Sequence, residues 1–193
     1  MRRVCVFCGS SVGNQAAYAE AAQAMGAVLA KRGIGLVYGG GNVGLMGVVA
    51  DAVMAHGGEA IGVIPRSLAD REVAHGGITQ LHVVDSMHTR KAMMAELSDG
   101  FVAMPGGVGT FEEFFEVVTW TQLGVHRKPC GLLNVSAFYT PLAAFIDQAV
   151  SEGFIKPVHR AAIVVDSDPA RLLDSLATVE LPKVPKWIGR EET

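Results

Sequence analysis

The sequence predicts an α/β fold: a single Rossmann-like domain with a doubly wound parallel sheet of about seven strands and helices on both faces. Strand-like segments alternate with helix-like segments along the whole chain. Most of the strand-like segments are nearly continuous apolar runs, which is typical of parallel strands covered on both faces. A length of 193 residues fits one domain. We place that domain at residues 1–180 and a C-terminal arm, rich in proline and containing one tryptophan, at residues 181–193.

The strands are predicted from short, β-rich apolar runs bounded by turn residues. Glycine follows the first two runs closely, and Pro65 stops the third. In chain order the predicted strands are residues 3–7, 34–38, 60–64, 81–84, 101–104, 131–134 and 163–165.

The helices are predicted from apolar residues that recur every three to four positions. Gly33 and Gly57 close the first two helices. Residues 66–77 are polar and are expected to be irregular, so they join two strands without a full helix. In chain order the predicted helices are residues 16–32, 45–56, 87–97, 111–123, 141–152 and 170–177.

Charge and cysteine usage narrow the possible partners and the compartment. The net charge is −3 and the pI is about 6.1, so no overall field attracts nucleic acid or an anionic membrane, and we expect neither as a partner. Cys5 and Cys8 lie three apart in a strand, which directs them to opposite faces. They therefore read as buried free thiols in a reducing compartment, not as a metal or redox pair. With no signal peptide or membrane span visible, we expect a cytoplasmic protein.

Polar or glycine-rich segments follow several strands at the same edge of the predicted sheet. They are residues 9–11, residues 39–44, the region leading to Arg90, and residues 106–110. Ligands of open parallel sheets bind beyond the carboxyl ends of the strands. The convergence of these segments therefore predicts a ligand site at that edge.

Residues 104–113 are the most informative segment. Three glycines between a strand and a helix let the backbone approach a ligand closely and leave helix amides free to bind phosphate. Glu113 lies one turn into the predicted helix. The combination indicates chemistry on a phosphorylated small molecule. A capping box formed by Thr110 and Glu113, which have the required spacing, remains an alternative.

The helix that carries Glu113 is expected to have two apolar faces. A helical wheel places Glu113, Val117 and Trp120 together, opposite a second face made of Phe111, Phe114, Phe115 and Val118. We therefore expect Glu113 to face a cleft or a subunit interface. We also expect it to be ionised, because the helix dipole favours negative charge near its N-terminus.

Two further motifs have open interpretations. Residues 39–44 satisfy G-x-G-x-x-G, but they follow the second strand, and Glu59 opens the next strand instead of closing it. This argues against a dinucleotide site and leaves a tight turn or a backbone wall around a nucleotide. Arg90 and Lys91 are either a solvated basic pair or an anchor for phosphate and ribose oxygens.

Residues 105–113, Pro-Gly-Gly-Val-Gly-Thr-Phe-Glu-Glu, resemble the P-G-G-x-G-T-x-x-E motif of the LONELY GUY (LOG) family. Residues 39–47 and 87–91 are similar to its companion segments, and the resemblance runs from about residue 4 to residue 155. The resemblance implies a phosphoribohydrolase that cleaves the N-glycosidic bond of N6-modified adenosine 5′-monophosphates, such as cytokinin riboside 5′-monophosphates, or of AMP. It implies no metal and no organic cofactor. The family is also labelled lysine decarboxylase, for which the sequence gives no chemical reason.

The resemblance also implies roles for individual residues. Arg90 and Glu113 are expected to be the catalytic pair, with the glycine amides and Thr110 on the phosphate. The expected substrate-binding residues are Ser10, Gly40, Gly41, Glu72, Lys91, Gly106, Gly107, Val108, Gly109, Thr110, Phe111, Glu112 and Thr119.

The role of Arg90 in the reaction stays open. It is expected either to anchor the phosphate and ribose or to assist the leaving purine. A non-catalytic nucleotide-binding protein, similar in fold to molybdenum-cofactor carriers, is the alternative function. The two-faced helix and the short chain predict a homodimer whose active site takes residues from both subunits.

Overall fold

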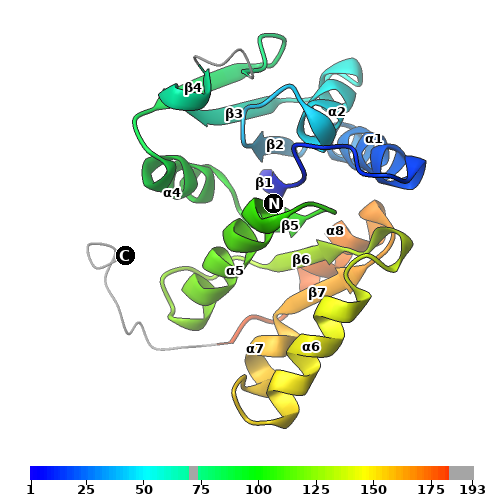
Figure 1. The fold of residues 1–193 in the computed structure, drawn as a ribbon, viewed down its shortest axis with the longest axis vertical. Coiled ribbons are helices and arrows are strands. Elements are labelled where there is room, and N and C mark those ends of the chain that lie inside the picture. The colour runs from blue at the N-terminus through cyan, green and yellow to red at the C-terminus, as the bar shows by residue number, and fades with distance from the viewer. Residues whose placement is uncertain (70–73, 183–193) are drawn as a thin grey trace.

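A computed structural model describes residues 1–69 and 74–182. In this part of the chain, seven parallel strands form one sheet in the order β4-β3-β2-β1-β5-β6-β7 (Figure 1). This confirms the predicted fold class. The strands are β1 Arg3–Phe7, β2 Gly35–Tyr38, β3 Ala60–Pro65, β4 Gln80–Val84, β5 Gly100–Ala103, β6 Cys130–Leu133 and β7 Ile163–Asp166.

Helices cover both faces of the sheet (Figure 1). One face carries α1 Ala16–Lys31, α2 Gly44–Ala55 and α8 Pro169–Thr178, and the other carries α4 Met87–Leu97, α5 Val108–Gln122 and α6 Thr140–Ser151. Short helices stand at α3 Arg66–Leu68 and α7 Pro157–Ala161, and a 3₁₀ turn spans Val135–Ala137.

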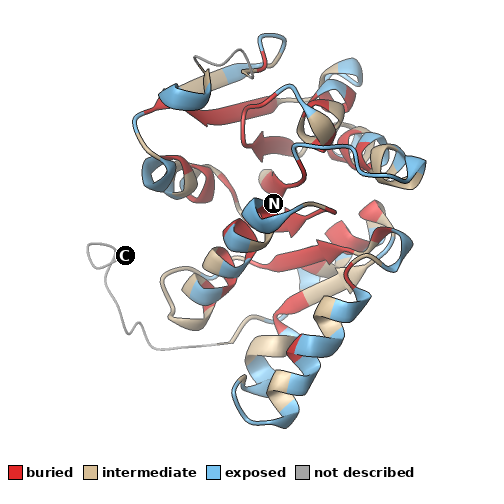
Figure 2. Cartoon of the chain, in the orientation of Figure 1, coloured by how far each residue is buried: buried red, intermediate tan, exposed pale blue. Residues whose placement is uncertain are grey.

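The core lies on the two faces of the sheet: the five inner strands are almost wholly buried, the edge strands β4 and β7 are only partly buried, and the helices expose their outer sides (Figure 2). Side chains alternate between the faces along β1 and just beyond it, so Cys5 belongs to the buried cluster that contains Phe101 and Cys8 to the cluster that contains Met25. The expectation that the two cysteines point to opposite faces is confirmed, and both are buried free thiols. Buried Tyr139 donates its hydroxyl hydrogen to the carbonyl O of Met104 at 2.7 Å, which fixes the end of β5.

Most predicted boundaries lie within two residues of those observed, but α5 begins three residues earlier than predicted. The backbone turns helical directly after Gly107, and Val108 at the first helical position is 82% exposed. Because Val108 has no place in the apolar periodicity, the pattern gave no sign of the earlier start. The five-residue α7 was also not predicted. It is too short for a periodic pattern, and its sequence signal is Pro157 in the first turn.

The strand order creates a crevice at the carboxyl edge of the sheet. β1 lies between β2 and β5, so the chain leaves β1 toward one face and leaves β5 toward the other. The loops after these two strands therefore diverge at a topological switch point, where open α/β sheets bind ligands. The loops in question are the Gly9-Ser10-Ser11 segment and the Pro105-Gly106-Gly107 segment.

Candidate active site

Arg90 is held at the start of α4 by the local sequence. Ser86 caps this helix, since its hydroxyl O accepts a hydrogen bond from the Thr89 amide at 3.1 Å. Arg90 then lies one turn in, with only 9% of its side chain exposed. Its Nη1 donates to Oε1 of Glu113 at 2.5 Å, and its Nε donates to the carbonyl O of Val63 at 3.1 Å. Arg90 is therefore not the solvated cation of the alternative reading.

Gly39 makes room for the Arg90 guanidinium. A Cβ at this position would lie 2.1 Å from Nη2 of Arg90, closer than any real contact. The neighbouring Gly40 has φ +74°, a conformation that favours glycine, and a Cβ there would press on Ile64. The loop after β2, residues 39–44, is called the glycine loop below. It is confined by Arg90 on one side and by β3 on the other.

Glu113 belongs to the buried stripe of α5. Only 11% of its side chain is exposed, and it shares the stripe with Phe114, Val117 and Val118. The predicted pair of opposite apolar faces is wrong, because Phe115 is 37% exposed. The capping box is also wrong, since Gly107 occupies the N-cap and Thr110 lies buried inside the first turn. Glu113 is therefore placed to hold Arg90, not to cap the helix.

Burial raises the pKa of Glu113 above its ordinary value, and the positive charge of Arg90 opposes this shift. The expectation that the helix dipole alone keeps this carboxylate ionised is therefore corrected. The Arg90 guanidinium is the group that favours the charged form. A buried carboxylate with one fixed counter-cation and a perturbed pKa is the type of group found at catalytic sites.

Lys91, like Arg90, extends from α4 to carboxylates on α5. Its Nζ lies 2.5 Å from Oε1 of Glu112 and 3.0 Å from Oε1 of Glu116, with 11% of the lysine side chain exposed. Burial lowers the pKa of Lys91, but its hydrogen bonds to the two carboxylates outweigh this and raise it. Glu116 was missed by sequence reasoning. Its signal is the i, i+4 spacing from Glu112, which places both carboxylates on one side of α5.

The glycines before and within α5 separate into two kinds. A Cβ on Gly106 would lie 2.2 Å from Oγ1 of Thr110, so the packing of the protein itself requires this glycine. A Cβ on Gly107 or Gly109 would meet nothing within 4 Å. The first helical acceptor in α5 is Gly107, whose carbonyl O takes a hydrogen bond from the Phe111 amide. The earlier amides, from Val108 to Thr110, therefore have no acceptor in the preceding turn of the helix, and amides of this kind bind anions at helix N-termini.

The loops after β1 and β2 pack against the segment that leads into α5. The Gly9 amide donates to the carbonyl O of Pro105 at 3.1 Å, and the Leu45 amide donates to the carbonyl O of Gly9 at 3.0 Å. Gly44 has φ +59°, and a Cβ there would lie 2.2 Å from the carbonyl carbon of Ser10. Together these loops enclose a hollow of about 250 Å³ that reaches from Ser10 to Gly107 and is bordered by the rings of Tyr18 and Phe138.

The other residues that were predicted to bind substrate lie in different places relative to the Arg90–Glu113 pair. Phe111 is half-buried and packs on the rings of Phe138 and Tyr139, beside the same hollow. Gly41 forms an isolated bridge with Ala74, so the glycine loop is a wall at the edge of the site. Thr119 lies exposed six residues beyond Glu113, with its hydroxyl donating to the carbonyl O of Phe115, and is not brought to the Arg90–Glu113 pair. Glu72 lies outside the described residues.

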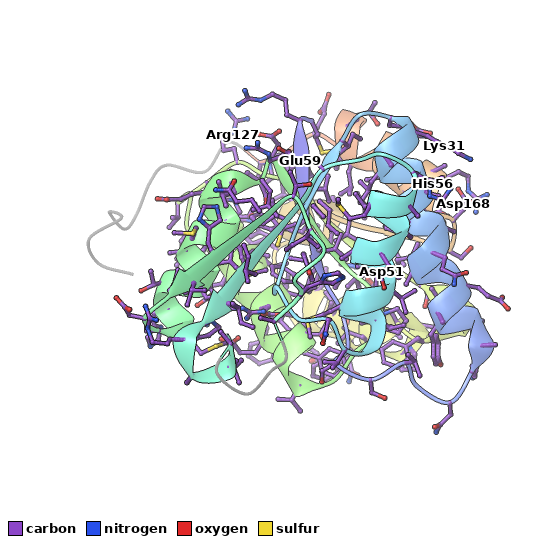
Figure 3. All side chains as sticks on the ribbon, turned by 90° about the horizontal axis from the view of Figure 1, so that it is seen from above. Lys31, Asp51, His56, Glu59, Arg127 and Asp168 are labelled. Carbon is purple, nitrogen blue, oxygen red and sulfur yellow. The ribbon has the colours of Figure 1, made fainter. Side chains whose placement is uncertain are left out.

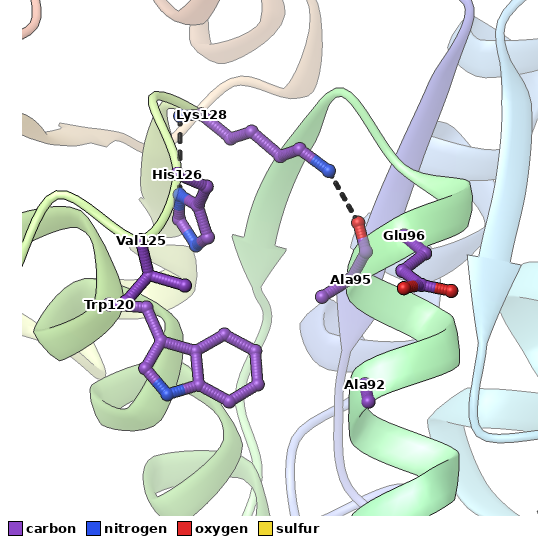
Figure 4. Close-up of a pocket in the computed structure, with 7 residues that line it drawn as sticks. All are labelled: Ala92, Ala95, Glu96, Trp120, Val125, His126 and Lys128. Carbon is purple, nitrogen blue, oxygen red and sulfur yellow. Dashed lines mark hydrogen bonds between the residues drawn. The ribbon is translucent and has the colours of Figure 1, made fainter. Parts of the chain in front are cut away.

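A second hollow, of about 220 Å³, lies between α4 and α5 (Figure 4). Trp120, Val125 and His126 line it on one side and Ala92 and Ala95 on the other. Neither Arg90 nor Glu113 lines it, so this hollow is not the cleft that Glu113 was expected to face. Val117, which the helical wheel grouped with Glu113, is buried in the core.

The described residues include no group of three histidine, cysteine, aspartate or glutamate side chains arranged to hold a metal ion. Within the same part of the chain, no helix combines the length and the apolar character that crossing a membrane requires.

Comparison with known proteins places the chain in a family. The family model described as "Possible lysine decarboxylase" matches residues 46–176. The cytokinin riboside 5′-monophosphate phosphoribohydrolase of Rhodococcoides fascians is 52% identical over 168 residues, which cover 86% of this chain and 85% of that protein. The enzyme of that name called LOG from Oryza sativa subsp. japonica is 54% identical over 172 residues, covering 89% of this chain and 71% of that protein.

Solved structures agree in fold. The molybdenum cofactor carrier protein of Chlamydomonas reinhardtii superposes with a TM-score of 0.70 at 20% identity, covering 92% of this chain and 96% of that chain. Identity at this level shows the fold alone. The identities above 50% to the phosphoribohydrolases carry more weight and confirm the resemblance inferred from residues 105–113. The chain belongs to the LOG family, whose family model bears the lysine decarboxylase description.

Proposed function

We propose that this protein hydrolyses the N-glycosidic bond of N6-modified adenosine 5′-monophosphates, releasing the free base and ribose 5-phosphate. The similar proteins from Rhodococcoides fascians and rice are named for this activity on cytokinin riboside 5′-monophosphates. The observation that carries the proposal is the buried Arg90–Glu113 pair beside an open helix N-terminus. AMP, which lacks the N6 substituent, is the second candidate substrate.

In this proposal the phosphate binds at the start of α5. The open space over Gly107 and Gly109 receives the phosphate oxygens, and the amides of Val108, Gly109 and Thr110 donate to them. The binding energy of this non-reacting group positions the ribose for reaction. A nucleoside without phosphate would lose that contribution.

The chemistry takes place at C1′ of the ribose. The bond from C1′ to the base nitrogen breaks and its electron pair leaves with the base, so the sugar develops oxocarbenium character. The oxygen of a water molecule then bonds to C1′ and loses a proton, while the leaving base gains one. We assign Glu113 to stabilising the positive sugar and orienting the water. Arg90 holds Glu113 and anchors the ribose phosphate.

The other predicted substrate-binding residues surround this centre. Ser10 lines the hollow next to the start of α5, and Phe111 packs on Phe138, which also lines it. Lys91, with Glu112 and Glu116, supplies a charged border along α4 and α5. Glu72 and Thr119 are part of the proposal through the family resemblance only.

Exposed apolar side chains follow several strands at the carboxyl edge of the sheet, which favours an N6-alkylated base. Val12, Val43, Met87 and Val108 follow four different strands there, and between 38% and 82% of each residue is exposed. Covering such side chains with an alkyl substituent removes apolar surface from water.

A cytoplasmic location and a homodimer are also proposed. The buried free thiols Cys5, Cys8 and Cys130 suit a reducing compartment. Val117 is buried in the core and is not available to a second subunit. The homodimer is supported instead by Phe115, whose exposed ring on α5 would be covered by a second copy.

The test is an incubation of purified protein with N6-isopentenyladenosine 5′-monophosphate and, separately, with AMP, followed by chromatography for free base and an assay for ribose 5-phosphate. Equal amounts of base and ribose 5-phosphate support the proposal, and the relative rates assign the preferred base. Nucleotide binding without release of base would instead favour a carrier.

A further inference from the structure

His75 is a buried histidine in the segment between α3 and β4. Its backbone amide donates to the carbonyl O of Gly40 at 2.8 Å, and Ala74 beside it forms an isolated antiparallel bridge with Gly41. The backbone at His75 is therefore pinned to the glycine loop that follows β2.

Both ring nitrogens of His75 also make hydrogen bonds. The Gly77 amide donates to Nδ1 at 3.1 Å, so in the neutral ring the hydrogen is carried by Nε2. That Nε2–H donates to Oδ1 of Asp51 at 3.1 Å. Asp51 lies on α2 (Figure 3). The imidazole is almost enclosed, while 73% of the Asp51 side chain is exposed. The ring thus ties the segment to α2 and fixes the turn that follows it.

The glycine loop transmits this anchoring toward the catalytic pair. A Cβ on Gly62 of β3 would lie 2.7 Å from Cα of Gly40, so the loop rests directly on β3. On the loop, the Arg90 guanidinium occupies the space where Gly39 lacks a side chain. A shift of the loop backbone by a few tenths of an ångström therefore displaces Arg90, which in turn bonds Glu113 at 2.5 Å.

We propose that His75 is a positioning residue for the glycosidase reaction: with Asp51 it holds the glycine loop against Arg90, and so sets the geometry of the Arg90–Glu113 pair. His75 touches neither of these two residues, so its effect passes through Gly40 and Gly39. The inference rests on the proposed function for its kinetic consequence, but the anchoring of the loop is independent of it.

The experiment compares kcat, KM and melting temperature for the wild type, three single variants, the double variant His75→Ala with Asp51→Ala, and one control. His75→Ala removes both ring bonds. His75→Gln keeps an amide near the Nε2 position that can donate to Asp51. Asp51→Ala removes the acceptor alone. Asp174→Ala is the matched control, because it removes a similarly exposed carboxylate that pairs with Arg32 at the C-terminus of α1.

We expect His75→Ala to lower kcat by about 10- to 100-fold with KM changed less than about threefold, since a displaced catalytic group mainly affects the transition state. His75→Gln should recover part of kcat, and Asp51→Ala should lower it a few-fold. The double variant should be no worse than His75→Ala, because both residues act along one path. Asp174→Ala should match the wild type.

Two results would overturn the inference. One is wild-type kcat in His75→Ala; the other is a loss of kcat that His75→Gln does not recover and that follows the melting temperature. Wild-type protein that releases no base from any nucleotide contradicts the proposed function instead. In that case amide hydrogen exchange tests whether His75 anchors the glycine loop. His75→Ala should speed the exchange of the amides in residues 39–42 and 74–77, and unchanged exchange there would refute the anchoring.

Discussion

Replacing Glu113 with Gln separates the catalytic role of this residue from its structural role. Gln keeps the shape of the side chain and an oxygen that accepts from Arg90 Nη1, while Arg90 retains its bond to the carbonyl O of Val63. A charge-assisted hydrogen bond contributes about 1 kcal/mol more than a neutral one. Relief from burying a carboxylate offsets part of this loss, as the raised pKa of Glu113 indicates. Unfolding free energy should therefore change by about 1 kcal/mol or less, or about 2–4 °C in melting temperature.

The effect on turnover should be far larger. Loss of the negative charge beside C1′ should lower kcat about 10³-fold, which corresponds to about 4 kcal/mol of transition-state stabilisation. Glu113→Ala should also destabilise the fold, by about 3–5 kcal/mol, because it removes the acceptor for Arg90 Nη1 and the packing of the side chain as well as the charge.

The assay pairs steady-state base release with thermal unfolding of the same samples. Glu59→Gln is the control, since Glu59 also pairs with an arginine, Arg3 at 2.8 Å, but at the opposite edge of the sheet. A Glu113→Gln variant with kcat within tenfold of the wild type would refute the catalytic assignment.

Three further outcomes are expected. Arg90→Lys should lower kcat/KM at least about 10²-fold, because one ammonium cannot replace a fork that bonds both Glu113 and Val63; steady-state kinetics within threefold of the wild type would contradict this. Gly107→Ala should raise KM about tenfold or more with an unchanged melting temperature, since the added methyl meets the phosphate and no protein atom; an unchanged KM would place the phosphate elsewhere. The acid limb of the kcat/KM–pH profile should lie above the ordinary glutamate pKa. Burial raises the pKa of Glu113, and activity is lost once falling pH protonates this carboxylate. An acid limb at the ordinary glutamate pKa, or one that persists in Glu113→Gln, would contradict this.

The fold could be predicted from sequence because each strand is an apolar run that ends at a turn residue. Runs such as β1 and β5 need no alternation when helices cover both faces, so their pattern is unambiguous. The same reasoning missed α7 and the early start of α5, where a few residues of helix depend on a proline or on tertiary contacts and not on periodicity.

The site was predictable in its parts but not in its pairing. The motif around Glu113 and the basic pair at Arg90 were visible, and the glycines indicated a phosphate cradle. The helical wheel correctly grouped Glu113 with Val117, but it treated them as a face opposite Phe114 and Val118, whereas these four residues share one buried stripe in which Glu113 meets Arg90. Which carboxylate meets which cation depends on how α4 and α5 pack, and that is not encoded in local spacing. For the same reason the contact of Glu116 with Lys91 and that of His75 with Asp51 were not predicted.

The most direct test of the proposed function is the phosphate dependence of base release. The measurement compares kcat/KM for N6-isopentenyladenosine 5′-monophosphate with kcat/KM for the nucleoside that lacks the phosphate. If the amides at the start of α5 bind the phosphate and position the ribose between Arg90 and Glu113, the nucleotide should be preferred by about 10³-fold or more. Comparable values for the two compounds, or no release from either, would contradict the proposal.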